Sequence, residues 1–295
     1  MSRLSSLGGL SHWHALTIAR FTIQEAISRR LILAAAVLSA AFVGLFALGF
    51  WFLFNSVPAM NGRQPNPEQV TVAGTILTVL GLYAVHFLSS ILALFLTVGA
   101  ISSEIDSGTL HAVLARPIRR ADVALGRWLA YAGLMCVYVT LVGGSILLLA
   151  WLITGYQSYD PVRALALMTL GALTLLTVSL LGSTMLSTLA NGVVAFSLFG
   201  LAWLGGLIEF TGGMVENPGM VNLGIAISLL VPSDAIWKAA SFYAQSPLFL
   251  AVGGTRGQVP FIGSAPPALP FLVWALAYPL VFLSLAVRAF SRRDL

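Results

Sequence analysis

The chain has 295 residues, of which 58% are hydrophobic and only 8% charged, and its mean hydropathy is +0.94. Soluble domains contain about 25% charged residues, so this composition excludes a soluble domain and predicts an integral membrane protein. The net charge of +5 does not indicate nucleic-acid binding, because the basic residues stand at the ends of apolar runs, where they act as topology signals.

The N-terminal residues 11–30 predict a helix that lies in the membrane interface and does not span it. Six apolar runs follow, and a membrane span takes about 20 such residues. The runs are residues 31–54, 70–101, 123–153, 164–189, 193–208 and 269–286. The sequence therefore predicts an all-α integral membrane protein with six transmembrane helices, arranged as a single transmembrane domain over residues 1–295.

The distribution of Lys and Arg predicts the orientation of the chain. With the N-terminus inside, the cytoplasmic segments hold eleven of the fifteen basic residues and the outer segments hold four. Basic residues are enriched on the cytoplasmic side of membrane proteins. We therefore expect both termini in the cytoplasm and the chain in the cell (inner) membrane.

The segment 211–268, between the last two runs, predicts an outer re-entrant or interfacial helical element. Its apolar stretch 220–231 has only twelve residues, too few to span. Ser233 and Asp234 then predict an N-cap for a second short helix over residues 235–244. Trp237 within this helix suits a position at the depth of the lipid headgroups.

The polar segment 102–122, between the second and third runs, carries three of the fifteen Lys and Arg residues, and Arg127 follows shortly after it. It predicts a short helix with an apolar ridge of Leu110, Val113 and Leu114, and Asp122 is expected to cap the third span. A ridge of this kind suits a socket on a partner protein, whereas the alternative is a helix on lipid with its arginines on anionic headgroups. The residues alone leave both alternatives open.

The same segment resembles a known family, the type-2 ABC exporter permeases. The residues that carry the likeness are Glu104, Gly108, Thr109, Leu110, Leu114, Pro117, Arg119, Arg120, Leu125, Gly126 and Arg127. The family pattern is E-x-x-x-G-T-L, then L-x-x-P-[VI]-S-R, then L-G-K, so Arg119 stands where the family often has Ser. The match is closest to the branch that includes the nitrous-oxide-reductase maturation permease, whose terminal F-x-R-R-D is similar to residues 290–294.

The resemblance implies that segment 102–122 is a coupling helix that docks into a separate cytoplasmic ABC ATPase. The docking residues would be Glu104, Asp106, Gly108, Thr109, Leu110, Val113, Leu114, Arg116, Pro117, Arg119 and Arg120. Two permeases, either two copies or this chain with a paralogue, would assemble with two ATPases. ATP and Mg would be bound by the partner, since the sequence lacks G-x-x-x-x-G-K-[ST], and no cofactor is expected on this chain.

Two ionisable residues are candidates for a translocation path. His86 lies in the middle of the second run, where such residues usually face the bundle interior; the alternative is a neutral imidazole bonded to a neighbouring Ser or Thr. Glu209, at the outer end of the fifth run, either guards an exit or lies hydrated among the headgroups. We therefore expect the permease subunit of an ATP-driven exporter, and the alternatives are an intramembrane lipid-modifying enzyme or a non-transporting membrane anchor.

Overall fold

The computed structural model describes residues 7–28, 30–56, 67–103, 119–251 and 261–292, and within these ranges the chain forms helices and no strands. Six of the helices there are long and apolar enough to cross a membrane. They are α2 (Arg30–Trp51), α4 (Pro67–Thr97), α7 (Arg120–Thr154), α8 (Pro161–Met185), α9 (Thr188–Met214) and α13 (Leu269–Arg292). The span that begins with α2 continues into a π-helical turn, η1 (Phe52–Ser56). The predicted all-α membrane fold is confirmed.

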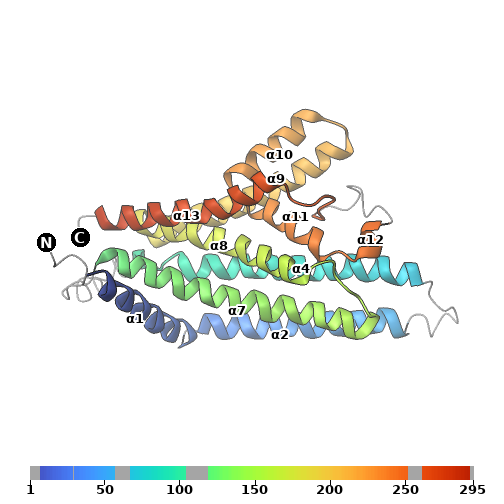
Figure 1. Cartoon of the computed structure of the whole chain (residues 1–295), viewed down its shortest axis with the longest axis horizontal. Helices are drawn as coiled ribbons and strands as arrows, with labels where there is room; N and C mark the ends of the chain where they lie inside the picture. Colours follow the sequence, from blue (N-terminus) through green and yellow to red (C-terminus); the bar gives the residue numbers. More distant parts are fainter. Residues whose placement is uncertain (1–6, 29, 57–66, 104–118, 252–260, 293–295) are drawn as a thin grey trace.

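The helices α2, α4, α7 and α8 lie side by side along the length of the molecule (Figure 1). The N-terminal helix α1 (Leu7–Ser28) packs across α7 at one end of this bundle. The starts of α2 and α7 and the ends of α4 and α13 lie at the same end (Figure 1). An even number of spans thus returns the chain to the end of the bundle where it began.

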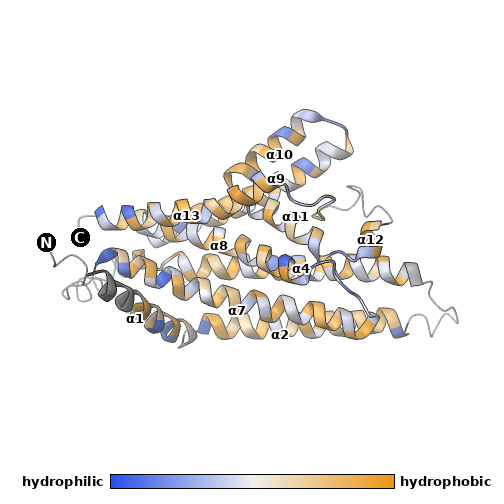
Figure 2. Cartoon of the chain, in the orientation of Figure 1, coloured by the Kyte–Doolittle hydropathy of each residue, from blue (hydrophilic) through white to orange (hydrophobic). Residues whose placement is uncertain are grey.

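The outer faces of the spans are apolar. Large hydrophobic side chains such as Leu45 and Leu48 of α2 are about two-thirds exposed, at 70% and 67%. Hydrophilic residues gather mostly near the helix ends, as Figure 2 shows. Apolar surfaces of this extent are costly in water, so they are consistent with contact with lipid.

Two predicted helix boundaries were wrong. The fourth run was expected to continue to residue 189, but α8 ends at Met185 and Ser187 begins the next helix by accepting a hydrogen bond from the backbone of Ala190 at 3.4 Å. The fifth span is consequently 27 residues long, where the sequence predicted a short one. Asp122 does not cap α7 either, because the helix already begins at Arg120.

The segment between α9 and α13 is helical, as predicted, and its position on the outer side of the membrane stays a prediction. Its main helices are α10 (Pro218–Leu230) and α11 (Ser233–Ala244), which are bent by 99° relative to each other, and a short α12 (Pro247–Ala251) follows. α10 folds back on α9 as a hairpin that projects from the bundle (Figure 1). The two helices pack closely, since a Cβ added at Gly224 would lie 2.7 Å from the carbonyl oxygen of Gly205.

α11 turns inward from this bend and enters the core. Trp237 is fully buried with Leu82 of α4 and Met168 of α8, so its ring contacts the helical core where the sequence suggested contact with lipid headgroups. The predicted N-cap was also wrong, because Pro232 precedes α11, and Ser233 and Asp234 form its buried first turn. The sequence placed these residues outside the helical core because periodicity gives no sign of the 99° bend.

Candidate functional site

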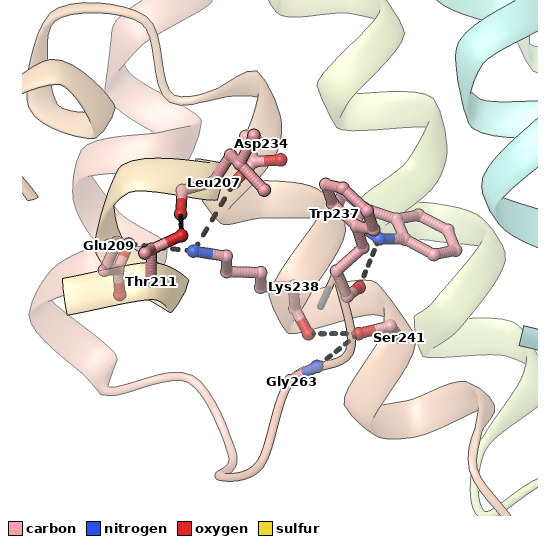
Figure 3. A network of polar contacts seen from close by, with 9 residues as sticks. Leu207, Glu209, Thr211, Asp234, Trp237, Lys238, Ser241 and Gly263 are labelled. Atoms are coloured by element: carbon pink, nitrogen blue, oxygen red, sulfur yellow. Dashed lines mark hydrogen bonds and ion pairs between the residues drawn. The ribbon is translucent and has the colours of Figure 1, made fainter. Parts of the chain in front are cut away.

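A partly buried cluster of charged groups joins α9 to α11. The Nζ of Lys238 donates a hydrogen bond to Oε2 of Glu209 at 2.8 Å, and it lies 3.5 Å from Oδ2 of Asp234 (Figure 3). Asp234 and Lys238 are four residues apart on α11, so their side chains share one face of the helix. One ammonium group is therefore shared between two carboxylates.

The position of Asp234 depends on a glycine in the neighbouring helix. A Cβ at Gly206 of α9 would collide with the Asp234 carboxylate, so only glycine leaves room for it. The side chain of Asp234 is 5% exposed. Burial raises the pKa of Asp234 to about 6, and the charge of Lys238 opposes this rise.

The cluster lies beside a cavity of about 830 Å³ between α9, α10, α11, the start of α13 and residues 261–268. Glu209 and Lys238 both line this cavity. Most of the rest of the wall is apolar; it includes Phe210, Met214, Val221, Ile225, Leu229, Phe261, Ile262 and Phe271. The volume falls in the range of about 300–1,000 Å³ that is usual for small-molecule sites. Such a wall suits a ligand with an apolar body and one charged group.

Hydrogen bonds hold one wall of the cavity to α11. The Oγ of Ser241 donates to the carbonyl oxygen of Lys238 at 2.8 Å and accepts from the backbone N–H of Gly263 at 2.7 Å (Figure 3). The indole N–H of Trp237 donates to the carbonyl oxygen of Phe261 at 2.6 Å. These bonds fix Phe261 although its φ of 67° lies in the left-handed region that is unfavourable for bulky residues.

His86 does not line the large cavity; it is buried between α4 and α11. Its ring stacks on Trp237 with 5.3 Å between the ring centroids, and its Nδ1 has no hydrogen-bond partner among the described residues. The hydroxyls of Ser89 and Ser90 bond to the backbone carbonyl of His86 at 2.8 Å, so the predicted bond from the imidazole to a neighbouring hydroxyl was wrong. Its role in a translocation path stays a prediction.

The structure places Glu209 in an ion pair, where the sequence suggested a hydrated carboxylate or an exit guard. Sequence reasoning missed both of its neighbours, Asp234 and Lys238. The signal was present, since Lys238 is the only lysine of the chain and follows Asp234 by one helical turn. The described residues contain no group of three or more His, Cys, Asp or Glu that could hold a metal ion.

Most of the predicted docking segment lies outside the described residues. Its unplaced members are Glu104, Asp106, Gly108, Thr109, Leu110, Val113, Leu114, Arg116 and Pro117. Of the other two, Arg119 is exposed and Arg120 begins α7. The coupling helix therefore stays a prediction, but the described ends of the segment, at α4 and α7, lie at the same end of the bundle (Figure 1).

Comparison with models of known protein families gives a match. A family model described as ABC-2 family transporter protein matches residues 16–295. The match includes all six candidate spans, the α10–α11 pair and the segment between α4 and α7. No curated protein matches the chain.

Proposed function

Since this chain belongs to the ABC-2 family of transporter proteins and is thus a membrane permease subunit of an ABC transporter, we propose that it couples ATP hydrolysis by a separate subunit to export. The observation that carries the proposal is the family match over residues 16–295, which includes the segment expected to dock. ATP and Mg would be bound by the partner. Assignment to the nitrous-oxide-reductase maturation branch stays a prediction.

The position of the segment 102–122 supports this coupling role. It connects the end of α4 to the start of α7, and its described end residues Arg119 and Arg120 add positive charge there. A force on the segment would act directly on these two helices, which pack against each other. Alternating packings of such helices are a common way to open a path on one side of a membrane and then the other.

We also propose an orientation of the chain in the membrane and a pairing with a second permease. Segment 102–122 and both termini would face the cytoplasm, because eleven of the fifteen basic residues then lie inside. The chain would lie in the cell (inner) membrane and pair with a second copy or a paralogue, as the ATPases would pair with each other.

Docking is tested by the double substitution Leu110→Asp and Leu114→Asp. We expect the co-expressed ABC ATPase to co-purify with the wild-type chain and not with this variant, because two carboxylates would be forced into an apolar socket. Val162→Asp, at an exposed position at the start of α8, is the matched control and should keep the ATPase. Normal co-purification with the double variant would contradict the docking assignment.

Orientation is tested separately by labelling. In a Cys136→Ala background, Thr109→Cys should react with a membrane-impermeant maleimide in inside-out vesicles and not in intact cells. Reaction from the outside would place the segment out of reach of a cytoplasmic ATPase. An ATPase that co-purifies but is not regulated by the chain would indicate the membrane-anchor alternative.

A further inference from the structure

We propose that the cavity beside Glu209 binds an amphipathic organic cation, a protonated amine or other onium group carried on an apolar body. The proposal concerns the chain itself and does not depend on ATPase docking. It rests on the shape of the cavity, its apolar wall and the two carboxyl groups that share one ammonium group beside it.

The charges favour a cation. Glu209 and Asp234 are two carboxylates that share the single ammonium of Lys238, at 2.8 Å and 3.5 Å. A ligand cation that pairs with Glu209 leaves Lys238 with Asp234 as its partner, so no buried charge loses its counter-ion. An anionic ligand would instead have to compete with both carboxylates for Lys238, and it would approach Glu209 at close range.

Of the two carboxyl groups, that of Glu209 is the one accessible to a ligand in the cavity. Its side chain is 32% exposed and lines the cavity, whereas Asp234 is 5% exposed and sits behind it against Gly206. Partial burial strengthens an ion pair because fewer water molecules screen it. Figure 3 shows Glu209 and Asp234 approaching the Lys238 ammonium from different directions.

The apolar wall suits the body of such a ligand. Phe210 and Phe271 are aromatic residues of the lining, and an aromatic ring face within about 6 Å of a cation attracts it. A volume of about 830 Å³ is large enough for a bulky onium ion. The segment with Phe261 is fixed to α11 by two hydrogen bonds, so this wall is preformed.

The test is equilibrium dialysis of radiolabelled tetraphenylphosphonium against the full chain in phosphatidylglycerol nanodiscs. Glu209→Gln should bind the probe about fivefold more weakly than the wild type, the loss expected for a partly exposed ion pair. Glu216→Gln, at an exposed position on the same hairpin, is the matched control and should bind as the wild type does. Equal binding by Glu209→Gln and the wild type would overturn the proposal.

A second variant tests the sign of the charge. Lys238→Gln should bind tetraphenylphosphonium more tightly than the wild type, because it frees both carboxylates, and it should not gain binding of tetraphenylborate, an anion of the same shape. Thermal unfolding of the variant checks that it is folded. A folded Lys238→Gln chain that bound the cation more weakly would overturn the assignment.

The lipid composition identifies the source of the cation. The ammonium of phosphatidylethanolamine has the same chemistry as a free amine. If the difference between wild type and Glu209→Gln persists in phosphatidylethanolamine nanodiscs, the site takes a free cation. If the difference is present in phosphatidylglycerol and disappears in phosphatidylethanolamine, the site takes the lipid headgroup, and the proposed chemistry stands with that source.

Discussion

Asn191, in the first turn of α9, donates a hydrogen bond from Nδ2 to the carbonyl oxygen of Val98, just after the end of α4, at 2.8 Å. The same amide donates to the carbonyl oxygen of Ser179 in α8 at 2.9 Å. Gly182 of α8 makes room for it, because a Cβ there would collide with the Asn191 side chain. One buried amide thus joins three spans where α4 leads into the segment proposed to dock.

Asn191→Ala should therefore destabilise the chain by about 1–3 kcal/mol, because it removes two buried hydrogen bonds, each of which contributes about 0.5–1.5 kcal/mol. The measurement is the free energy of unfolding, or the change in Tm, of the purified chain in detergent. Asn222→Ala, at an exposed position on α10, is the matched control and should change little. Similar changes in Tm for the two variants would show that the amide contributes no more than a surface residue.

Gly206→Ala tests whether the Asp234 carboxylate must sit against the backbone of α9. The added methyl group would collide with this carboxylate, so we expect a loss of stability of about 1–3 kcal/mol, typical of overpacking. Gly200→Ala is the matched control on the same helix, since its Cβ would meet no atom within 4 Å. That control should stabilise α9 by up to about 1 kcal/mol, because alanine favours helix over glycine. Thermal unfolding of both variants should thus give shifts of opposite sign, and a stabilised Gly206→Ala chain would contradict the placement of Asp234.

The number of spans could be predicted from the sequence because each span is an apolar run long enough to cross a bilayer, and this signal is local. The boundary between α8 and α9 could not be placed. By hydropathy, residues 186–189 continue the fourth run. In the structure α8 ends at Met185, and Ser187 caps the start of α9. Asn191 falls in the gap between the predicted fourth and fifth runs, and it is buried by contacts with α4 and α8 that hydropathy does not show.

The candidate site could be predicted only in part. Glu209 stands out as a charged residue at the end of an apolar run, whereas its contact with Lys238 links residues 29 positions apart. That contact exists because the chain bends by 99° between α10 and α11, which brings α11 beside α9. Short apolar helices give no sign of the angle between them, so Trp237 was placed at the surface and Asp234 was taken for a cap.

His86 can be tested by two substitutions that separate packing from polarity. His86→Phe keeps a ring against Trp237 and removes a buried nitrogen that has no partner among the described residues, so its stability should equal or exceed that of the wild type. His86→Ala removes the ring and should lose about 2–4 kcal/mol through the cavity left in the core.

The readouts for His86 are Tm and the ATPase activity of the assembled complex. If His86 lines a translocation path, His86→Phe should alter the activity although the fold is kept. Unchanged activity would leave His86 with a packing role alone. A His86→Phe chain less stable than His86→Ala would instead show that the imidazole nitrogen has a bonding partner that the protein needs.

Tyr278 of α13 fixes the bend from which α11 departs. Its hydroxyl donates to the carbonyl oxygen of Leu230 at 2.6 Å, and Leu230 is the last residue of α10, where a helix leaves its carbonyl groups without internal partners. Tyr278→Phe keeps the ring, which stacks on Phe282 with 4.4 Å between the centroids, and removes only the donor. We expect a loss of about 1 kcal/mol in the free energy of unfolding.

The bend also positions Lys238 beside Glu209, so Tyr278→Phe should weaken the binding of tetraphenylphosphonium as well as lower Tm. Tyr159→Phe, where the ring is 54% exposed, is the matched control and should change neither quantity. If Tyr278→Phe lowered Tm but left cation binding intact, the bend would be held by the Pro232 backbone and the packing of α10 on α9, and the hydroxyl would act only on stability. Unchanged Tm and binding in both variants would show that the Leu230 carbonyl is satisfied without Tyr278.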